Sequence, residues 1–318
     1  SDLLENPHGC IMTLVPKKGL AAQREKELEE KLEAYRSSLS EEQLDAMVEK
    51  TKALEAYQEA GEDPKALECI PMLKRSDIKR EAAKIINEEL TVDDSLFLYH
   101  DVCTNGIGYV DLMFKTDSIA PEQIPYLGLL KSVLGYVDTE NYTYGELFNE
   151  INANTGGINC GVEVFDRADS TEEFQAMFSV RGKALYTKMD FLFKMIGEIL
   201  NSSKLEDTKR LYEIVASVKS RAQVNLTGAG HSTAVLRAAA YSSPMAAFQD
   251  EMAGIGYYQF IEKLEKDFEQ RKEETVEELC KLMKKILRPE NFMISYTGER
   301  ESLETVQKLA GAVKAGLG

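Results

Sequence analysis

Residues 126–163 constrain the fold most, because two helix patterns and a strand pattern follow one another there. Apolar residues recur at helical spacing after Pro121, at Ile124, Leu127, Leu130 and Leu134. Thr143 and Glu146 have the spacing of a capping box, which predicts a second helix running to Asn154. Alternating apolar residues then predict a strand over 158–165. We therefore expect helix, turn, helix and strand in this order.

Other period-two patterns predict strands over 96–100, 107–115, 173–182 and 292–297. Asn105-Gly106 separates the first two, and this dipeptide favours a hairpin that pairs them. Helical spacing predicts further helices over 189–200, 205–218, 273–287 and 301–318. Strands paired by hairpins with helices beside them indicate an α+β fold, an antiparallel sheet flanked by helices.

The N-terminal part has a different pattern. The apolar run 9–15 is expected to form a strand, and residues 20–60 predict two helices separated by a joint, the second capped by Ser40 and Gln43. Gly61 and Pro64 end the second helix. Two such helices indicate an antiparallel helical hairpin. We expect a terminal strand at 1–19, a hairpin at 20–62 and one domain at 63–318.

Composition excludes several functions. The formal net charge of −16 argues against nucleic acid as a partner, because phosphate neutralisation needs clustered Lys and Arg. No run reaches the roughly 18 apolar residues of a membrane span. Five scattered cysteines favour reduced thiols and a cytoplasmic location. The three histidines show no i,i+4 pair, so the pattern predicts no metal site and no catalytic residues.

Two motifs resemble a known family. Asn152-Ala153-Asn154-Thr155 ends the second predicted helix, and residues 230–262 follow the pattern G-H-x-x-A-x-x-R-A … S-P … G-I-x-Y-Y-x-F. Both are similar to pitrilysin/insulinase-like zinc metallopeptidases of the presequence-protease subfamily. In that family a helix carries H-x-x-E-H, which supplies two zinc ligands and a general base. Tyr126, Leu129 and Leu130 stand at the matching positions here.

The resemblance implies a non-catalytic segment of a longer peptidase that degrades short unfolded peptides. Residues 1–19 would end a preceding domain, the hairpin would join the two halves, and 63–318 would form the third of four domains and part of the chamber wall. Zinc would be bound outside this segment, which would need no cofactor and be inactive alone. Its partners would be the remaining domains of the parent chain and the unfolded peptide substrate.

The strand that follows the second helix is the sharpest site candidate. An edge strand can accept a peptide as an additional strand, and small residues permit close backbone approach. The candidate residues are Gly157, Ile158, Asn159, Cys160, Gly161 and Val162. An ordinary interior strand with a glycine bulge is the other interpretation. Two functional alternatives also stay open: an autonomous peptide-binding or assembly module without hydrolytic activity, and an enzyme with an unrecognised site. Arg237 is interpreted as a structural ion-pair partner.

Overall fold

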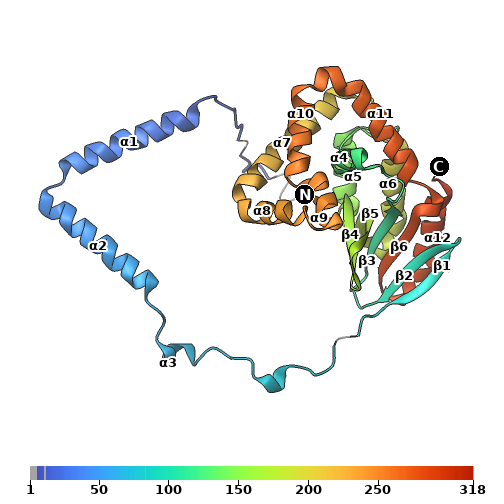
Figure 1. The fold of residues 1–318 in the computed structure, drawn as a ribbon, viewed down its shortest axis with the longest axis horizontal. Coiled ribbons are helices and arrows are strands. Elements are labelled where there is room, and N and C mark those ends of the chain that lie inside the picture. Colours follow the sequence, from blue (N-terminus) through green and yellow to red (C-terminus); the bar gives the residue numbers. More distant parts are fainter. Residues whose placement is uncertain (1–5, 11, 83, 318) are drawn as a thin grey trace. The chain divides into compact units, whose positions relative to one another are not determined.

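The computed structural model describes residues 6–10, 12–82 and 84–317, and the chain divides into two units, 1–82 and 83–318 (Figure 1). The first unit contains α1 (Leu20–Ser38), α2 (Glu41–Glu59) and the short α3 (Pro64–Leu67). The predicted helix pair is therefore confirmed. At the start of α2, the Ser40 hydroxyl accepts from the Gln43 amide at 3.3 Å, and the Ser40 amide donates to Gln43 Oε1 at 2.9 Å.

Neither α1 nor α2 buries a side chain. In α1 the apolar stripe is more than half exposed, with Leu28 at 56% and Leu32 at 57%. The packing of the two helices as an antiparallel hairpin stays a prediction. The strand expected over 9–15 is not formed in residues 9–10 and 12–15, and Ile11 lies outside the described residues. A strand needs a neighbour for its backbone groups, and no described strand pairs with this run.

The second unit is built on a six-stranded sheet of order β1-β2-β6-β3-β5-β4. Its strands are β1 (Glu88–Val92), β2 (Ser95–Asp101), β3 (Ile107–Lys115), β4 (Ile158–Arg167), β5 (Ser170–Leu185) and β6 (Phe292–Gly298). All neighbours are antiparallel except β2 and β6, which are parallel. The α+β class and the mostly antiparallel sheet are confirmed. The compact unit starts near residue 83, whereas the domain predicted from the sequence starts at 63.

The predicted hairpin between β2 and β3 is wrong, because β6 lies between these strands and pairs with both. The turn itself is present: Asn105 and Gly106 have φ of 54° and 81°. Glu299, just after β6, holds this link in place, since its Oε1 accepts from the amides of Thr104 at 3.0 Å and Asn105 at 3.1 Å. The turn therefore connects β2 to β3 across the width of β6, instead of joining two strands that pair with each other.

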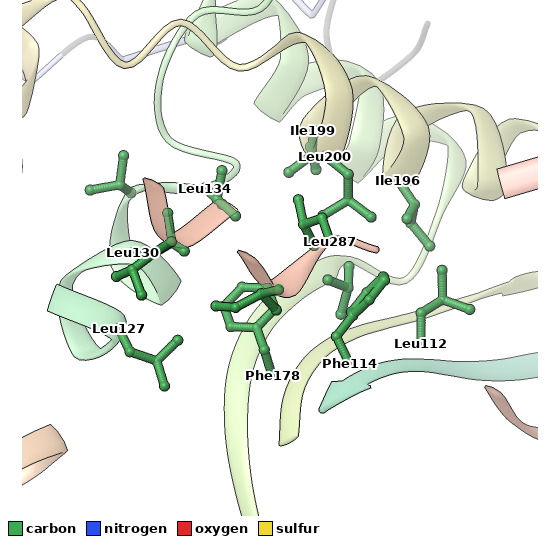
Figure 2. Close-up of a cluster of buried hydrophobic side chains, with 14 of the residues drawn as sticks. Leu112, Phe114, Leu127, Leu130, Leu134, Phe178, Ile196, Ile199, Leu200 and Leu287 are labelled. Atoms are coloured by element: carbon green, nitrogen blue, oxygen red, sulfur yellow. The ribbon is translucent and has the colours of Figure 1, made fainter. Parts of the chain in front are cut away.

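Helices cover one face of the sheet. They are α4 (Ile124–Val133), α5 (Tyr144–Asn154), α6 (Met189–Ser202), α7 (Thr208–Gly228), α8 (Gly230–Ala239), α9 (Pro244–Ala253), α10 (Ile255–Lys266), α11 (Phe268–Ile286) and α12 (Leu303–Ala315). Figure 2 shows Leu130 of α4 and Ile196 of α6 turned toward Phe178 and Leu112 of the sheet. Each of these side chains is at most 1% exposed. The hydrophobic effect of this single buried layer fixes the sheet against the helices.

The helical layer contains one close backbone approach, between α4 and α9. A Cβ placed on Gly128 would lie 2.6 Å from the Met252 carbonyl oxygen and 2.8 Å from the Tyr257 ring. The backbone atom cannot swing away as a flexible side chain would. Glycine is therefore required at 128 for the two helices to approach this closely.

We predict that Gly128→Ala lowers the free energy of unfolding by about 1–3 kcal/mol, because α4 and α9 must separate to admit the methyl group. Urea denaturation followed by circular dichroism measures this change. The matched control is Gly197→Ala in α6, where a Cβ meets nothing within 4 Å. The control should be neutral or stabilise by up to about 1 kcal/mol. Equal effects of the two substitutions would contradict the packing argument.

Candidate functional site

The positions that match the zinc motif lie inside the helical layer. Leu129 and Leu130 are 0% and 1% exposed, and Tyr126 is 6% exposed. The Tyr126 hydroxyl accepts from Arg271 Nη2 at 2.8 Å and donates to Glu274 Oε1 at 3.4 Å. Burial raises the pKa of Tyr126, which the nearby Arg271 guanidinium partly offsets. Leucine has no atom that binds a metal, and the phenol oxygen is occupied. This surface of α4 is thus built for packing, and its assignment to the family's motif stays a prediction.

The described residues contain no group of three or more His, Cys, Asp or Glu arranged to hold a metal ion. His100 on β2 is engaged at both ring nitrogens: Nδ1 lies 2.7 Å from the Ile86 carbonyl oxygen and Nε2 3.2 Å from Ser295 Oγ. His231 is exposed near the start of α8. As for membrane insertion, none of the described helices is long and apolar enough to cross a bilayer.

The long motif at 230–262 organises α8, α9 and α10 around one buried carboxylate. Asp250 is 1% exposed, and its Oδ2 accepts from Arg237 Nη1 at 2.6 Å. Its Oδ1 accepts from the Ile255 amide at 3.1 Å, and Oδ2 also from the Gly256 amide at 3.2 Å. A carboxylate is favourable at a helix N-terminus, here that of α10. The structural interpretation of Arg237 is confirmed, since its partner is this helix cap.

Strand β4 is an edge strand, because it pairs with β5 on one side and with no described strand on the other. The ladder fixes which backbone groups face that open side. Thr116 donates from its amide to the Ala176 carbonyl at 3.3 Å, so Ala176 bonds toward β3. Neighbouring residues in an antiparallel strand bond to opposite sides, which directs Met177, Ser179 and Arg181 of β5 toward β4.

The same alternation continues across β4. The partners of Met177, Ser179 and Arg181 are Glu163, Gly161 and Asn159, which use their backbone groups inside the sheet. The residues between them, Ile158, Cys160 and Val162, therefore direct their N–H and C=O groups to the open edge. Their side chains lie on the helix side, where Ile158, Cys160 and Val162 pack against the core.

Two cavities flank the start of β4, one on each face of the sheet. The cavity on the helix side, of about 220 Å³, lies between β4, α5 and the end of α4. The other cavity, of about 310 Å³, lies on the face of the sheet that no described helix of this unit covers, which we call the open face. It is lined by polar residues that include Asn159, Arg181 and Lys183. Arg181 is neutralised there, with Nε 2.8 Å from Asp111 Oδ2 and Nη1 3.1 Å from Glu163 Oε1. The two faces beside β4 thus differ in polarity.

Lys183 lies beside Arg181 in the lining of this cavity and forms no ion pair with the described residues. Its Nζ lies 6.0 Å from the centroid of the Tyr109 ring on the neighbouring strand β3. Burial raises the pKa of Asp111, against the opposing effect of Arg181. Tyr109, Arg181 and Lys183 were not predicted as site residues from the sequence. Period two places them on one face, but only the strand order brings them beside Asn159.

Cys160 lines the cavity on the helix side. Burial raises the pKa of its thiol to about 12, so almost none of it is thiolate near neutral pH. Cys69 and Cys103 are exposed. The thiolate is the reactive form of cysteine, so we expect Cys160 to react much more slowly in the folded chain than the exposed cysteines.

We predict that an alkylating reagent at about pH 8 labels Cys69 and Cys103 of the folded chain and leaves Cys160 unmodified. Unfolding in urea removes the burial, and all three should then react. Mass spectrometry of proteolytic fragments reads out each position. Labelling of Cys160 at the rate of Cys103 in the folded chain would contradict the position of its thiol.

The comparisons with known proteins agree on one family. The model of the family described as Peptidase M-16C associated matches residues 14–264. Protein HypA of Clostridium perfringens is 34% identical over 306 residues, covering 96% of this chain and 31% of that protein. Presequence protease 1, chloroplastic/mitochondrial, of Arabidopsis thaliana is 27% identical over 306 residues, covering 96% of this chain and 28% of that protein.

The chain thus spans less than a third of the length of these two relatives. Among solved structures, that of a conserved protein from Enterococcus faecalis V583 has a TM-score of 0.52 and 13% identity, over 72% of this chain and 52% of that one. At this identity the likeness concerns the fold alone.

Proposed function

Because this chain belongs to the family described as Peptidase M-16C associated, as a non-catalytic domain of presequence protease-like peptidases, we propose that it serves a longer zinc-dependent peptidase. The parent chain would degrade short unfolded peptides, with zinc bound in another domain acting as Lewis acid and activating water. This segment would form chamber wall and the link between the two halves. Its expected location is the cytoplasm.

The observation that carries this proposal is the burial of one surface of α4. The resemblance assigns Tyr126, Leu129 and Leu130 to the positions of two metal ligands and a general base, and all three side chains are buried among apolar neighbours. Restoring ligands there would place polar groups in an apolar layer at considerable cost. A segment that supports catalysis elsewhere has no need of them.

The two long N-terminal helices support the role of a link. Their apolar residues are exposed although they follow helical spacing, as Leu28, Leu32 and Leu54 illustrate at 56%, 57% and 55%. Exposed apolar stripes of this kind are typical of surfaces that a partner covers. The remaining domains of the parent chain are the partner we propose.

We predict that this chain alone neither retains stoichiometric zinc nor hydrolyses a fluorogenic unstructured peptide, whereas the full-length parent does both. Elemental analysis and a peptidase assay with added zinc measure the two properties. The parent treated with a chelator is the control and should lose activity, then regain it with zinc. Zinc-dependent hydrolysis by this chain in isolation would overturn the non-catalytic assignment.

A second function is favoured by the open edge of β4, namely binding of an unfolded peptide without hydrolysis. Ile158, Cys160 and Val162 offer backbone donors and acceptors there, and an extended peptide could pair with them as a further strand. This candidate applies to the isolated chain and to the parent alike. It assigns the residues 157–162 as the binding segment.

We predict that Val162→Pro weakens binding of a short extended peptide at least about tenfold, because it removes an N–H directed to the open edge and leaves the ladder with β5 intact. Fluorescence anisotropy of a labelled peptide measures the affinity. Val162→Ala is the matched control, since it trims the side chain and keeps the N–H. Circular dichroism verifies that both variants fold. Unchanged affinity in the proline variant would exclude strand addition at β4.

A further inference from the structure

We propose that the cavity on the helix side of β4 is a subsite for one bulky apolar side chain of an extended peptide. The inference rests on strand addition at β4 as the proposed binding mode. Strand addition alone does not select a side-chain type or fix the register of the bound peptide, and the subsite would do both.

The cavity lies directly beside the open backbone groups. Gly157, Ile158, Asn159 and Cys160 form one wall, and Phe148, Ile151 and Asn152 of α5 form the opposite one. Its inner end is closed by Leu134 and Ile199, which are 2% and 1% exposed and belong to the core in Figure 2. A peptide paired with β4 therefore passes along the mouth of an apolar recess.

The pairing geometry determines which peptide residue enters. Residues directly opposite each other on neighbouring strands place their side chains on the same face of the sheet. Ile158 and Cys160 point to the helix side, so the peptide residues opposite them point there as well. The peptide residue between these two points to the helix-free face of the sheet, near Asn159 and Arg181. One residue in every two can therefore reach the cavity.

The lining selects an uncharged, apolar occupant. No Asp, Glu, Lys or Arg lines the cavity, and the polar side chains in its lining on the helix side are those of Tyr136 and Asn152. Any charge that entered would lose its hydration without gaining a partner. The volume of about 220 Å³ is larger than the roughly 150 Å³ that holds a benzene molecule in an engineered protein cavity. A phenylalanine or leucine side chain thus suits this space.

Two aromatic side chains at the rim are available for contact. Phe148 is 56% exposed and Tyr136 is 50% exposed, although both are large and Phe148 is apolar. An aromatic ring that enters the cavity would cover part of both, and aromatic pairs gain attraction beyond the area they bury. The exposed area of Phe148 is thereby explained as a contact surface.

The test compares two labelled peptides of alternating serine and threonine, one with a central phenylalanine and one with serine in its place. Fluorescence anisotropy with the folded chain should show the phenylalanine peptide binding about tenfold more tightly. Phe148→Ala should remove most of this difference and leave the affinity for the serine peptide unchanged. The control is Phe165→Ala, an exposed phenylalanine on β4 seven residues beyond Ile158, roughly 23 Å along the strand, and it should preserve the difference.

The outcomes separate this subsite from the binding mode on which it rests. Binding of both peptides with equal affinity, and its loss in Val162→Pro, would overturn the subsite while strand addition stands. Absence of binding by either peptide would overturn both. A preference for phenylalanine that survives Phe148→Ala would overturn the assignment to this cavity. Hydrogen exchange supplies a second readout, since the amides of Ile158, Cys160 and Val162 should be protected only when peptide is bound.

Discussion

The sheet depends on one strand that comes from the far end of the domain. β6 lies between β2 and β3, and it is the only described strand that joins the β1–β2 pair to the rest. Its inward side chains are completely enclosed: Ile294 and Tyr296 are 0% exposed, and the rings of Tyr99 and Tyr296 stack with centroids 6.0 Å apart. The helices can cover a continuous face only when this strand is in place. Residues close to 200 positions apart must therefore meet before the core is complete.

This dependence explains which parts of the fold the sequence predicts. Strands and helices of the domain lie where period-two and helical patterns indicate them, because each pattern reflects one buried face. The insertion of β6 between β2 and β3 could not be predicted, since Asn105 and Gly106 indicate a turn and carry no information about a strand that pairs between the two. β1 was not predicted, for another reason. Glu88 and Glu89 are exposed edge residues, so they show no alternation of apolar and polar side chains.

The candidate site, too, could be predicted from the sequence only in part. Glycines and alternating apolar residues predict a strand at 158–165 that suits an edge, and the sheet order places β4 there. The outward direction of Ile158, Cys160 and Val162 follows only from the register with β5. The cavity beneath them needs α5 and α6 in position, which depends on tertiary packing. The hydrogen bonds of Tyr126 with Arg271 and Glu274 join residues about 145 positions apart in the sequence, and no local sequence pattern predicts them.

The two margins of the sheet have opposite chemistry, and this limits how copies of the chain can associate. Glu88 and Glu89 make β1 acidic, and Arg300 holds Glu88 and Asp101 in ion pairs at 2.6 and 3.3 Å. A second copy that approached this margin would meet like charge, a common protection of edge strands. β4 has no charged residue between Ile158 and Val162. Self-association through β4 uses the same surface on both molecules and closes on itself, so it ends at a pair and cannot propagate into a fibre.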